Sequence, residues 1–129
     1  MTEKKRILLV DDDTDLVEAL KVTFENAGFD VAAAYSGEDG LKLAKEKKPD
    51  LIVLDVMMGG KHGFNVCKEL KGNKETSSIA ILIFSAMTGR GDARFPLEIG
   101  MDTEADNFLE KPLKPSEVLE HVKELLARG

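Results

Sequence analysis

Short apolar segments alternate along this chain with longer segments whose apolar residues recur at helical spacing. Short continuous apolar runs indicate strands that are buried on both faces, which is typical of parallel sheets covered by helices. The alternation of such strands with helices therefore predicts an α/β fold. The predicted strands are residues 7–10, 31–34, 51–54, 79–84 and 107–110.

The amphipathic segments between these strands predict helices that cover the sheet. A helix over residues 13–27 would end before Gly28, and Ser36 can cap a helix that runs to about residue 47. A short helix is predicted over residues 64–70, and the last helix begins near Pro115, a favourable first-turn residue. The side chains expected to face inward are Leu16, Leu20, Phe24, Ala27, Leu41, Ala44, Phe64, Cys67, Leu70, Val118, Leu119, Val122, Leu125 and Leu126.

Right-handed crossovers leave few ways to order five parallel strands. The common solution for a small α/β domain is a single doubly wound, flavodoxin-like sheet with strand order 2-1-3-4-5 and helices on both faces. A chain of 129 residues suits one domain, so we expect residues 1–129 to form it, with a core from about residue 5 to residue 127. In such sheets ligands bind at the carboxyl ends of the strands, between strands one and three.

Composition narrows the classes of function. The net charge of −6 and the pI near 5.0 argue against a domain that itself binds nucleic acid or an anionic membrane, because both of these bind basic surfaces. No apolar run approaches the roughly 18 residues that a membrane span needs. The single cysteine, Cys67, allows no intrachain disulfide and is expected to be a buried packing residue, so we expect a cytoplasmic location.

Residues with reactive side chains follow four of the five predicted strands. Because parallel strands end at the same edge of a sheet, we expect these groups to converge. Clustered carboxylates repel one another and stay ionised only beside a cation, and Mg²⁺ suits a partly hydrated site of oxygen ligands. The residues are Asp11, Asp12 and Asp13 after the first strand, Asp55 after the third, Ser85 after the fourth, and Lys111 and Pro112 after the fifth.

A carboxylate at such a site can attack phosphorus to give an aspartyl phosphate. The incoming phosphoryl group then needs positive charge on its equatorial oxygens, which Mg²⁺ and Lys111 would supply while Ser85 offers a hydroxyl. Plainer interpretations also exist. The aspartates at 11–13 could cap a helix, and Asp13 is expected to do so, while Ser85 and Lys111 taken alone could be an ordinary strand-end hydroxyl and a solvated charge.

Four segments in this order resemble the response-regulator receiver family, and the resemblance spans nearly the whole chain: residues 8–12, 54–58, 84–86 and 108–112. The resemblance implies that Asp55 is the phosphoacceptor. It implies that Mg²⁺ is held by Asp11, Asp12, Asp55 and the backbone carbonyl of Met57. By the same resemblance Ser85 and Phe108 are switch residues, Lys111 completes the catalytic set, and the Lys111–Pro112 peptide is cis.

The resemblance also implies partners. The phosphoryl donor would be a sensor histidine kinase or a histidine phosphotransfer protein. The target that responds to phosphorylation would be a downstream output protein or domain. The resemblance implies that such a domain is not an independent enzyme. It only catalyses, with Mg²⁺, the transfer of a phosphoryl group to its own aspartate and the slow loss of that group. Three departures stand out: Gly59 in place of the family's usual proline, Phe108 in place of the commoner tyrosine, and a longer, Gly-rich stretch between Ser85 and Lys111.

Two other classes of function compete with this interpretation. An aspartyl-nucleophile phosphatase of the haloacid-dehalogenase type wants a second aspartate two residues after the first, and that position holds Met57. A flavodoxin-like cofactor binder needs a Ser/Thr/Gly-rich phosphate loop after the first strand, where three aspartates would repel a phosphate.

Residues 88–100 are the least regular part of the pattern. Gly89, Gly91 and Pro96 disfavour helix there, so we expect a short or irregular fourth helix and the greatest mobility in the chain. The acidic run of Asp102, Glu104 and Asp106 is expected to add repulsion near the carboxylates of the site.

Overall fold

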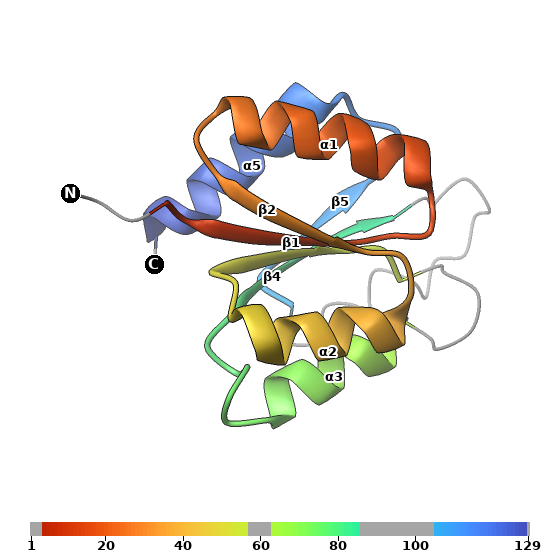
Figure 1. Ribbon diagram of the computed structural model, residues 1–129, viewed down its shortest axis with the longest axis vertical. Helices are drawn as coiled ribbons and strands as arrows, with labels where there is room; N and C mark the ends of the chain where they lie inside the picture. The colour runs from red at the N-terminus through yellow and green to blue at the C-terminus, as the bar shows by residue number, and fades with distance from the viewer. Residues whose placement is uncertain (1–3, 57–62, 86–104, 129) are drawn as a thin grey trace.

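One five-stranded parallel sheet with the order β2-β1-β3-β4-β5 forms the centre of the protein (Figure 1). The structure is a computed structural model that describes residues 4–56, 63–85 and 105–128. The strands are β1 (Arg6–Val10), β2 (Asp30–Ala34), β3 (Leu51–Leu54), β4 (Ala80–Ser85) and β5 (Asn107–Glu110). The predicted flavodoxin-like order of the sheet is confirmed.

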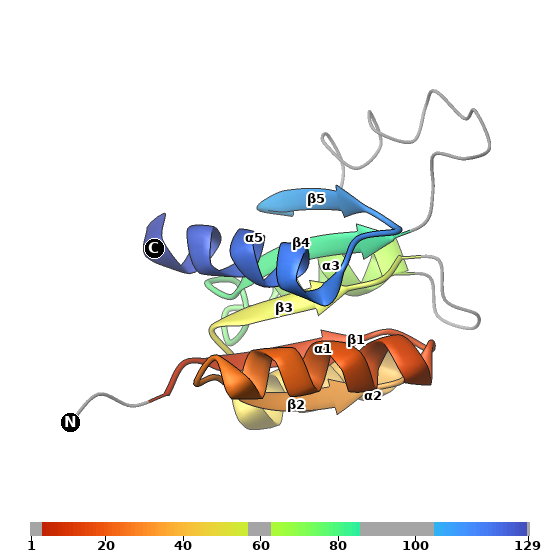
Figure 2. The same cartoon turned by 90° about the horizontal axis from the view of Figure 1, so that it is seen from above.

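Helices of the described residues cover both faces of the sheet (Figures 1 and 2). Helices α1 (Thr14–Asn26) and α5 (Pro115–Arg128) lie on one face, and α2 (Gly37–Lys47) and α3 (Gly63–Gly72) lie on the other. Each face has its own core, because successive strand residues point to opposite sides. Leu9, Val53 and Phe84 belong to the α1–α5 core, whereas Val10, Leu54 and Ile83 belong to the α2–α3 core.

The register of the strands brings their carboxyl ends level. Val10 pairs with Leu54, and Leu54 pairs with Ile83. Ser85 at the end of β4 pairs with Glu110 at the end of β5. The residues that follow these pairs therefore emerge at the same edge of the sheet, which is the edge that the sequence predicted for the site.

Capping residues set where two helices begin. The side chain of Asp13 accepts a hydrogen bond from the backbone N–H of Leu16 at 3.1 Å, and that of Ser36 accepts one from Asp39 at 3.2 Å. Both predicted caps are confirmed. After α1 the chain reverses at Gly28, whose φ of 96° is a conformation that favours glycine.

Eight of the fourteen predicted inward-facing residues are buried, four are half-buried and one is exposed, while the side chain of Phe64 lies outside the described part of the structure. Ala27 is exposed, because α1 ends at Asn26 and Ala27 is already its C-cap. Val17, which was not predicted, is buried, whereas Leu16 and Leu41 are half-buried. Leu119 and Leu126 are only half-buried, since they flank the buried row of Val118, Val122 and Leu125. Cys67 is fully buried, as expected for a packing residue.

Some expectations concern parts of the chain that the structure leaves undescribed. The predicted irregularity and mobility of residues 88–100 lie outside the described residues, as does the loop that contains Gly59. Within the described part of the chain, no helix is long and apolar enough to cross a membrane.

Candidate functional site

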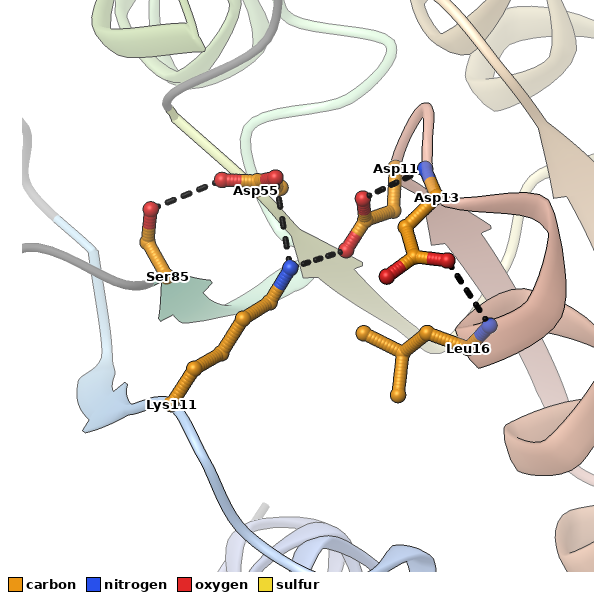
Figure 3. A network of polar contacts seen from close by, with 6 residues as sticks. All are labelled: Asp11, Asp13, Leu16, Asp55, Ser85 and Lys111. Atoms are coloured by element: carbon orange, nitrogen blue, oxygen red, sulfur yellow. Dashed lines mark hydrogen bonds and ion pairs between the residues drawn. The ribbon is translucent and has the colours of Figure 1, made fainter.

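Asp11 and Asp55 lie side by side where β1 and β3 end (Figure 3). The backbone N–H of Asp55 donates to the carbonyl of Val10 at 2.9 Å, which continues the pairing of the two strands by one residue. The backbone N–H of Asp11 likewise donates to Ala34 at 3.1 Å. Both carboxyl groups are nearly inaccessible, with 5% and 6% of each residue exposed. The sheet itself thus holds two acids together out of water.

Lys111 reaches both of these acids from the loop after β5. Its Nζ lies 2.8 Å from Oδ2 of Asp11 and 3.4 Å from Oδ2 of Asp55 (Figure 3). The backbone N–H of Lys111 donates to the carbonyl of Ser85 at 2.9 Å, which joins this loop to the end of β4. The Lys111–Pro112 peptide bond is cis.

Ser85 contacts the other oxygen of Asp55. Its Oγ donates to Oδ1 at 2.7 Å, and the residue is fully buried. Asp55 therefore has a hydroxyl on one oxygen and an ammonium on the other (Figure 3). Phe108, the other predicted switch residue, pairs with Ile83 in the sheet register and is half-buried against the α2–α3 core.

The side chain of Asp13 caps α1, whereas its backbone contacts the site. Its N–H donates to Oδ1 of Asp11 at 3.0 Å, while its own carboxylate caps the helix (Figure 3). Asp11 is thereby fixed through both of its oxygens, since Lys111 contacts Oδ2. The division of roles among the three successive aspartates follows from this geometry.

Asp11, Asp12 and Asp55 could together hold a metal ion. Each offers a carboxylate oxygen, and these oxygens all lie within 4.8 Å of one another. Asp12 is exposed, so water can complete such a site from its side. Oxygen ligands with access to water are the donor set that Mg²⁺ prefers. Met57, the fourth expected ligand, lies outside the described residues.

Electrostatics at the site also favour a bound cation. Burial raises the pKa of Asp11 to about 6, and the charge of Asp55 adds to this rise, while the hydrogen bonds from Lys111 and the Asp13 N–H oppose it. Burial alone would lower the pKa of Lys111, but its hydrogen bonds to Asp11 and Asp55 and their charges outweigh burial and raise it. One firmly charged ammonium therefore faces three carboxylates, and a cation would relieve the excess negative charge.

Sequence reasoning missed one neighbour of Lys111. The Nζ of Lys111 lies over the ring of Phe84, 5.5 Å from its centroid. Phe84 immediately precedes Ser85 on β4, so strand alternation could have placed its ring on the α1–α5 side of the sheet. The contact itself could not be foreseen, because it depends on the path of the loop that carries Lys111.

The expected role of Asp106 is wrong. This residue was expected to add repulsion near the acids of the site, but it lies at the amino end of β5, at the opposite edge of the sheet. There its Oδ2 accepts a hydrogen bond from the Ile81 N–H at 2.7 Å and lies 3.2 Å from Nζ of Lys71. Asp106 precedes β5 and Lys111 follows it, so the two residues lie at opposite ends of this strand.

Comparison with known proteins identifies the family. Residues 7–123 match the family described as Response regulator receiver domain. The chain is 41% identical, over 97% of its length, to the alkaline phosphatase synthesis transcriptional regulatory protein PhoP of Bacillus subtilis. It is 35% identical, over 99% of its length, to the DNA-binding response regulator MtrA of Mycobacterium tuberculosis. The alignments cover 50% and 53% of those two proteins, so the chain spans about half the length of these relatives.

A solved structure agrees with this similarity. The receiver domain of a Francisella response regulator superposes with a TM-score of 0.82 at 29% identity. That match covers 97% of this chain and 98% of the other.

Proposed function

Because the chain belongs to the response regulator receiver domain family of two-component signalling, we propose that Asp55 is the residue that accepts the phosphoryl group. One observation carries this proposal. Asp55 is a buried carboxylate within reach of two other acids, with the Ser85 hydroxyl on one oxygen and Lys111 on the other. No other acid among the described residues combines these neighbours.

We infer the following roles for the chain's own residues. Asp55 is the nucleophile, and one of its carboxylate oxygens forms the new bond to phosphorus while the donor's imidazole leaves. Lys111 neutralises charge on the transferred group, because its ammonium already lies 3.4 Å from Asp55. Ser85 donates a hydrogen bond to another phosphoryl oxygen after it leaves Oδ1 of Asp55.

We propose that Asp11, Asp12 and Asp55 hold Mg²⁺, with the carbonyl of Met57 as a further ligand. When bound, the ion supplies positive charge against the oxygens of the transferred group. Asp11 is the residue best oriented for this, since the Asp13 N–H and Lys111 fix its two oxygens. The short distances between the three acids support the assignment.

The switch that we propose runs through Ser85 and Phe108. Movement of the Ser85 hydroxyl toward a phosphoryl oxygen would vacate space beside β5, and the half-buried Phe108 ring could turn into it. Phosphorylation would then shift a pre-existing equilibrium at the face formed by β5 and its flanking elements. The shift is limited by the difference in contact free energy between the two states, which is at most about a few kcal/mol.

The partners that we propose are a sensor histidine kinase or histidine phosphotransfer protein as donor, and an output protein or domain as target. PhoP and MtrA are described as transcriptional and DNA-binding regulators, and the chain aligns with about half of each. We propose that any contact with DNA belongs to an output domain, because the net charge of this chain is −6. We also propose a cytoplasmic location, where ATP-dependent kinases supply phosphoryl groups.

We propose further that the domain does not turn over an external substrate, and acts only on its own aspartyl phosphate. An independent aspartyl phosphatase would need a second acid two residues after the nucleophile, and Met57 occupies that position. Turnover of a phosphomonoester by the purified domain would revive this alternative.

The acceptor can be tested with acetyl phosphate and Mg²⁺, followed by mass spectrometry of the intact protein and its peptides. We expect a single phosphoryl adduct on Asp55 that is stable in acid and labile in base. The adduct should be absent from Asp55→Asn and from wild-type protein in EDTA.

Asp50→Asn is the matched control, because Asp50 and Asp55 flank the same strand, β3, at its two ends. Asp50 accepts a hydrogen bond from the Arg6 N–H and is remote from the acids of the site. The control should be labelled like the wild type. Equal labelling of Asp55→Asn would show that the acceptor lies elsewhere.

A further inference from the structure

The last two residues of β4 serve the site from opposite faces of the sheet. Ser85 contacts Asp55, whereas Phe84 belongs to the core under α1 and α5 and has its ring beneath the Lys111 ammonium. The distance of 5.5 Å from Nζ to the ring centroid is within the range of about 6 Å in which a cation is attracted to an aromatic face. Both contacts follow from the alternation of adjacent side chains along one strand.

The ring of Phe84 is held more firmly than the lysine above it. Phe84 is 1% exposed and packs in a core that includes Leu9, Val53 and Leu109. Lys111 comes from a loop, its side chain is 17% exposed, and its four-carbon stem has many rotamers. A fixed ring face beneath a flexible cation restricts where that cation can sit.

The carboxylates alone do not define one position for the ammonium. Its Nζ is close to Asp11 at 2.8 Å but further from Asp55 at 3.4 Å, so attraction to the acids alone permits displacement toward exposed Asp12 and solvent. The face of the Phe84 ring adds a further attraction without competing for a hydrogen-bond donor. A buried ring also excludes water from beneath the ammonium, which strengthens its ion pairs.

We propose that Phe84 is a positioning residue for phosphoryl acceptance, whose ring face holds the Lys111 ammonium between Asp11 and Asp55. This inference rests on the proposed role of Asp55 and Lys111 and extends it to an apolar residue beneath Lys111. Phe84 acts through Lys111, so the electron density of its ring matters as well as its volume.

Fluorination of the ring separates these two properties. Site-specific replacement of Phe84 by mono-, di-, tri- and pentafluorophenylalanine keeps nearly the same shape and progressively removes the negative potential of the ring face. We expect the rate of phosphorylation by acetyl phosphate, at limiting donor and saturating Mg²⁺, to fall stepwise along the series. The full fall should be about fivefold, which corresponds to a cation–π contact of about 1 kcal/mol.

Phe24 provides the matched control within the same core. It is fully buried and packs against Phe29 at 6.4 Å between ring centroids, whereas the described ring beneath the Lys111 ammonium is that of Phe84. Fluorination of Phe24 should leave the rate at the wild-type value. Phe84→Leu, which keeps an apolar side chain without a ring, should be as slow as the pentafluoro variant or slower.

A spectroscopic measurement tests the contact apart from any phosphorylation. Protons on Cε of Lys111 should show an upfield ring-current shift in the wild type that disappears in Phe84→Leu. If the wild type shows this shift but is never phosphorylated on Asp55, the proposed function fails while the contact stands. If every fluorinated variant is phosphorylated at the wild-type rate, or the ring-current shift is absent, Phe84 is a core residue only and the inference is overturned.

Discussion

Two lysines at opposite edges of the same sheet are built into very different surroundings. Lys111 and Lys71 are similarly accessible, with 17% and 14% of their side chains exposed. Lys71 contacts one carboxylate, that of Asp106, and donates to the carbonyl of Ile79 at 2.9 Å. Lys111 instead faces Asp11 and Asp55, with Asp12 close by.

The difference lies in how completely the charges are balanced. Among the described residues at the Lys71 edge, one cation contacts one acid, which joins α3 to the start of β5. The same acid accepts a hydrogen bond from the Ile81 N–H, which joins the start of β5 to β4. At the Lys111 edge three acids outnumber one cation in the described part of the chain, and burial raises the pKa of Asp11 to about 6. An edge with balanced charges contributes to stability, whereas an edge with excess negative charge is suited to bind a cation and to react.

Replacing each lysine by methionine should show the difference between the two edges most clearly. Lys111→Met removes the only ammonium that contacts Asp55 among the described residues, so we expect phosphorylation by acetyl phosphate to slow by about a hundredfold or more. Lys71→Met should be phosphorylated at close to the wild-type rate. Stopped-flow or quenched labelling with Mg²⁺ at saturation measures both, and equal slowing would show that the two edges are not separable.

The second prediction concerns stability, for which we expect the Lys71 edge to matter more. Lys71→Met leaves the Ile79 carbonyl and the Asp106 carboxylate without their shared cation, so the free energy of unfolding should fall by about 2 kcal/mol. Urea denaturation followed by circular dichroism measures the loss. Lys74→Met changes an exposed lysine in the neighbouring loop and should leave the midpoint unchanged. A similar loss in that control would attribute the effect to net charge.

The fold and the Lys111 edge were predictable because both follow from periodicity along the chain. Apolar runs placed the strands, and the strand ends then placed Asp11, Asp55, Ser85 and Lys111 at one edge. The same logic placed Asp13 as a cap. Once the order of the strands is known, the place of each reactive residue can be predicted, because each directly follows its strand or ends it.

The Lys71 edge was not predictable in the same way. Lys71 is the penultimate residue of α3 and Asp106 precedes β5, so their contact depends on how far a helix extends and on how a connection returns to the sheet. Sequence alone grouped Asp106 with its acidic neighbours instead. The contact between Phe84 and Lys111 escaped prediction for the same reason, because it depends on the path of a loop.

The third prediction concerns stability at the Lys111 edge without metal. The pKa of Asp11 in the folded protein, about 6, lies above its ordinary value of 3.8, so the folded protein binds this proton more tightly than the unfolded chain does. Asp11 therefore contributes stability below about pH 4 that is lost as the pH rises through 6. Asp11→Asn lacks this contribution. In EDTA its stability relative to the wild type should increase by about 1 to 3 kcal/mol between pH 4 and pH 7, and parallel pH profiles would contradict the assignment.

The smallest predicted effect is on the affinity for Mg²⁺, and it distinguishes the two edges by pH. A metal must displace the proton from Asp11, whose pKa of about 6 means that roughly nine tenths of this group is protonated at pH 5. We therefore expect Mg²⁺ to bind about tenfold more weakly at pH 5 than at pH 7.5, as measured by an NMR titration of the amides of Asp11, Asp12 and Asp55. Amides of Lys71 and Asp106 should not respond to Mg²⁺ at either pH, because their charges are already balanced. Equal affinity at the two pH values would mean that Asp11 is not a ligand, and a response at Lys71 would mean that the edges are coupled through the sheet.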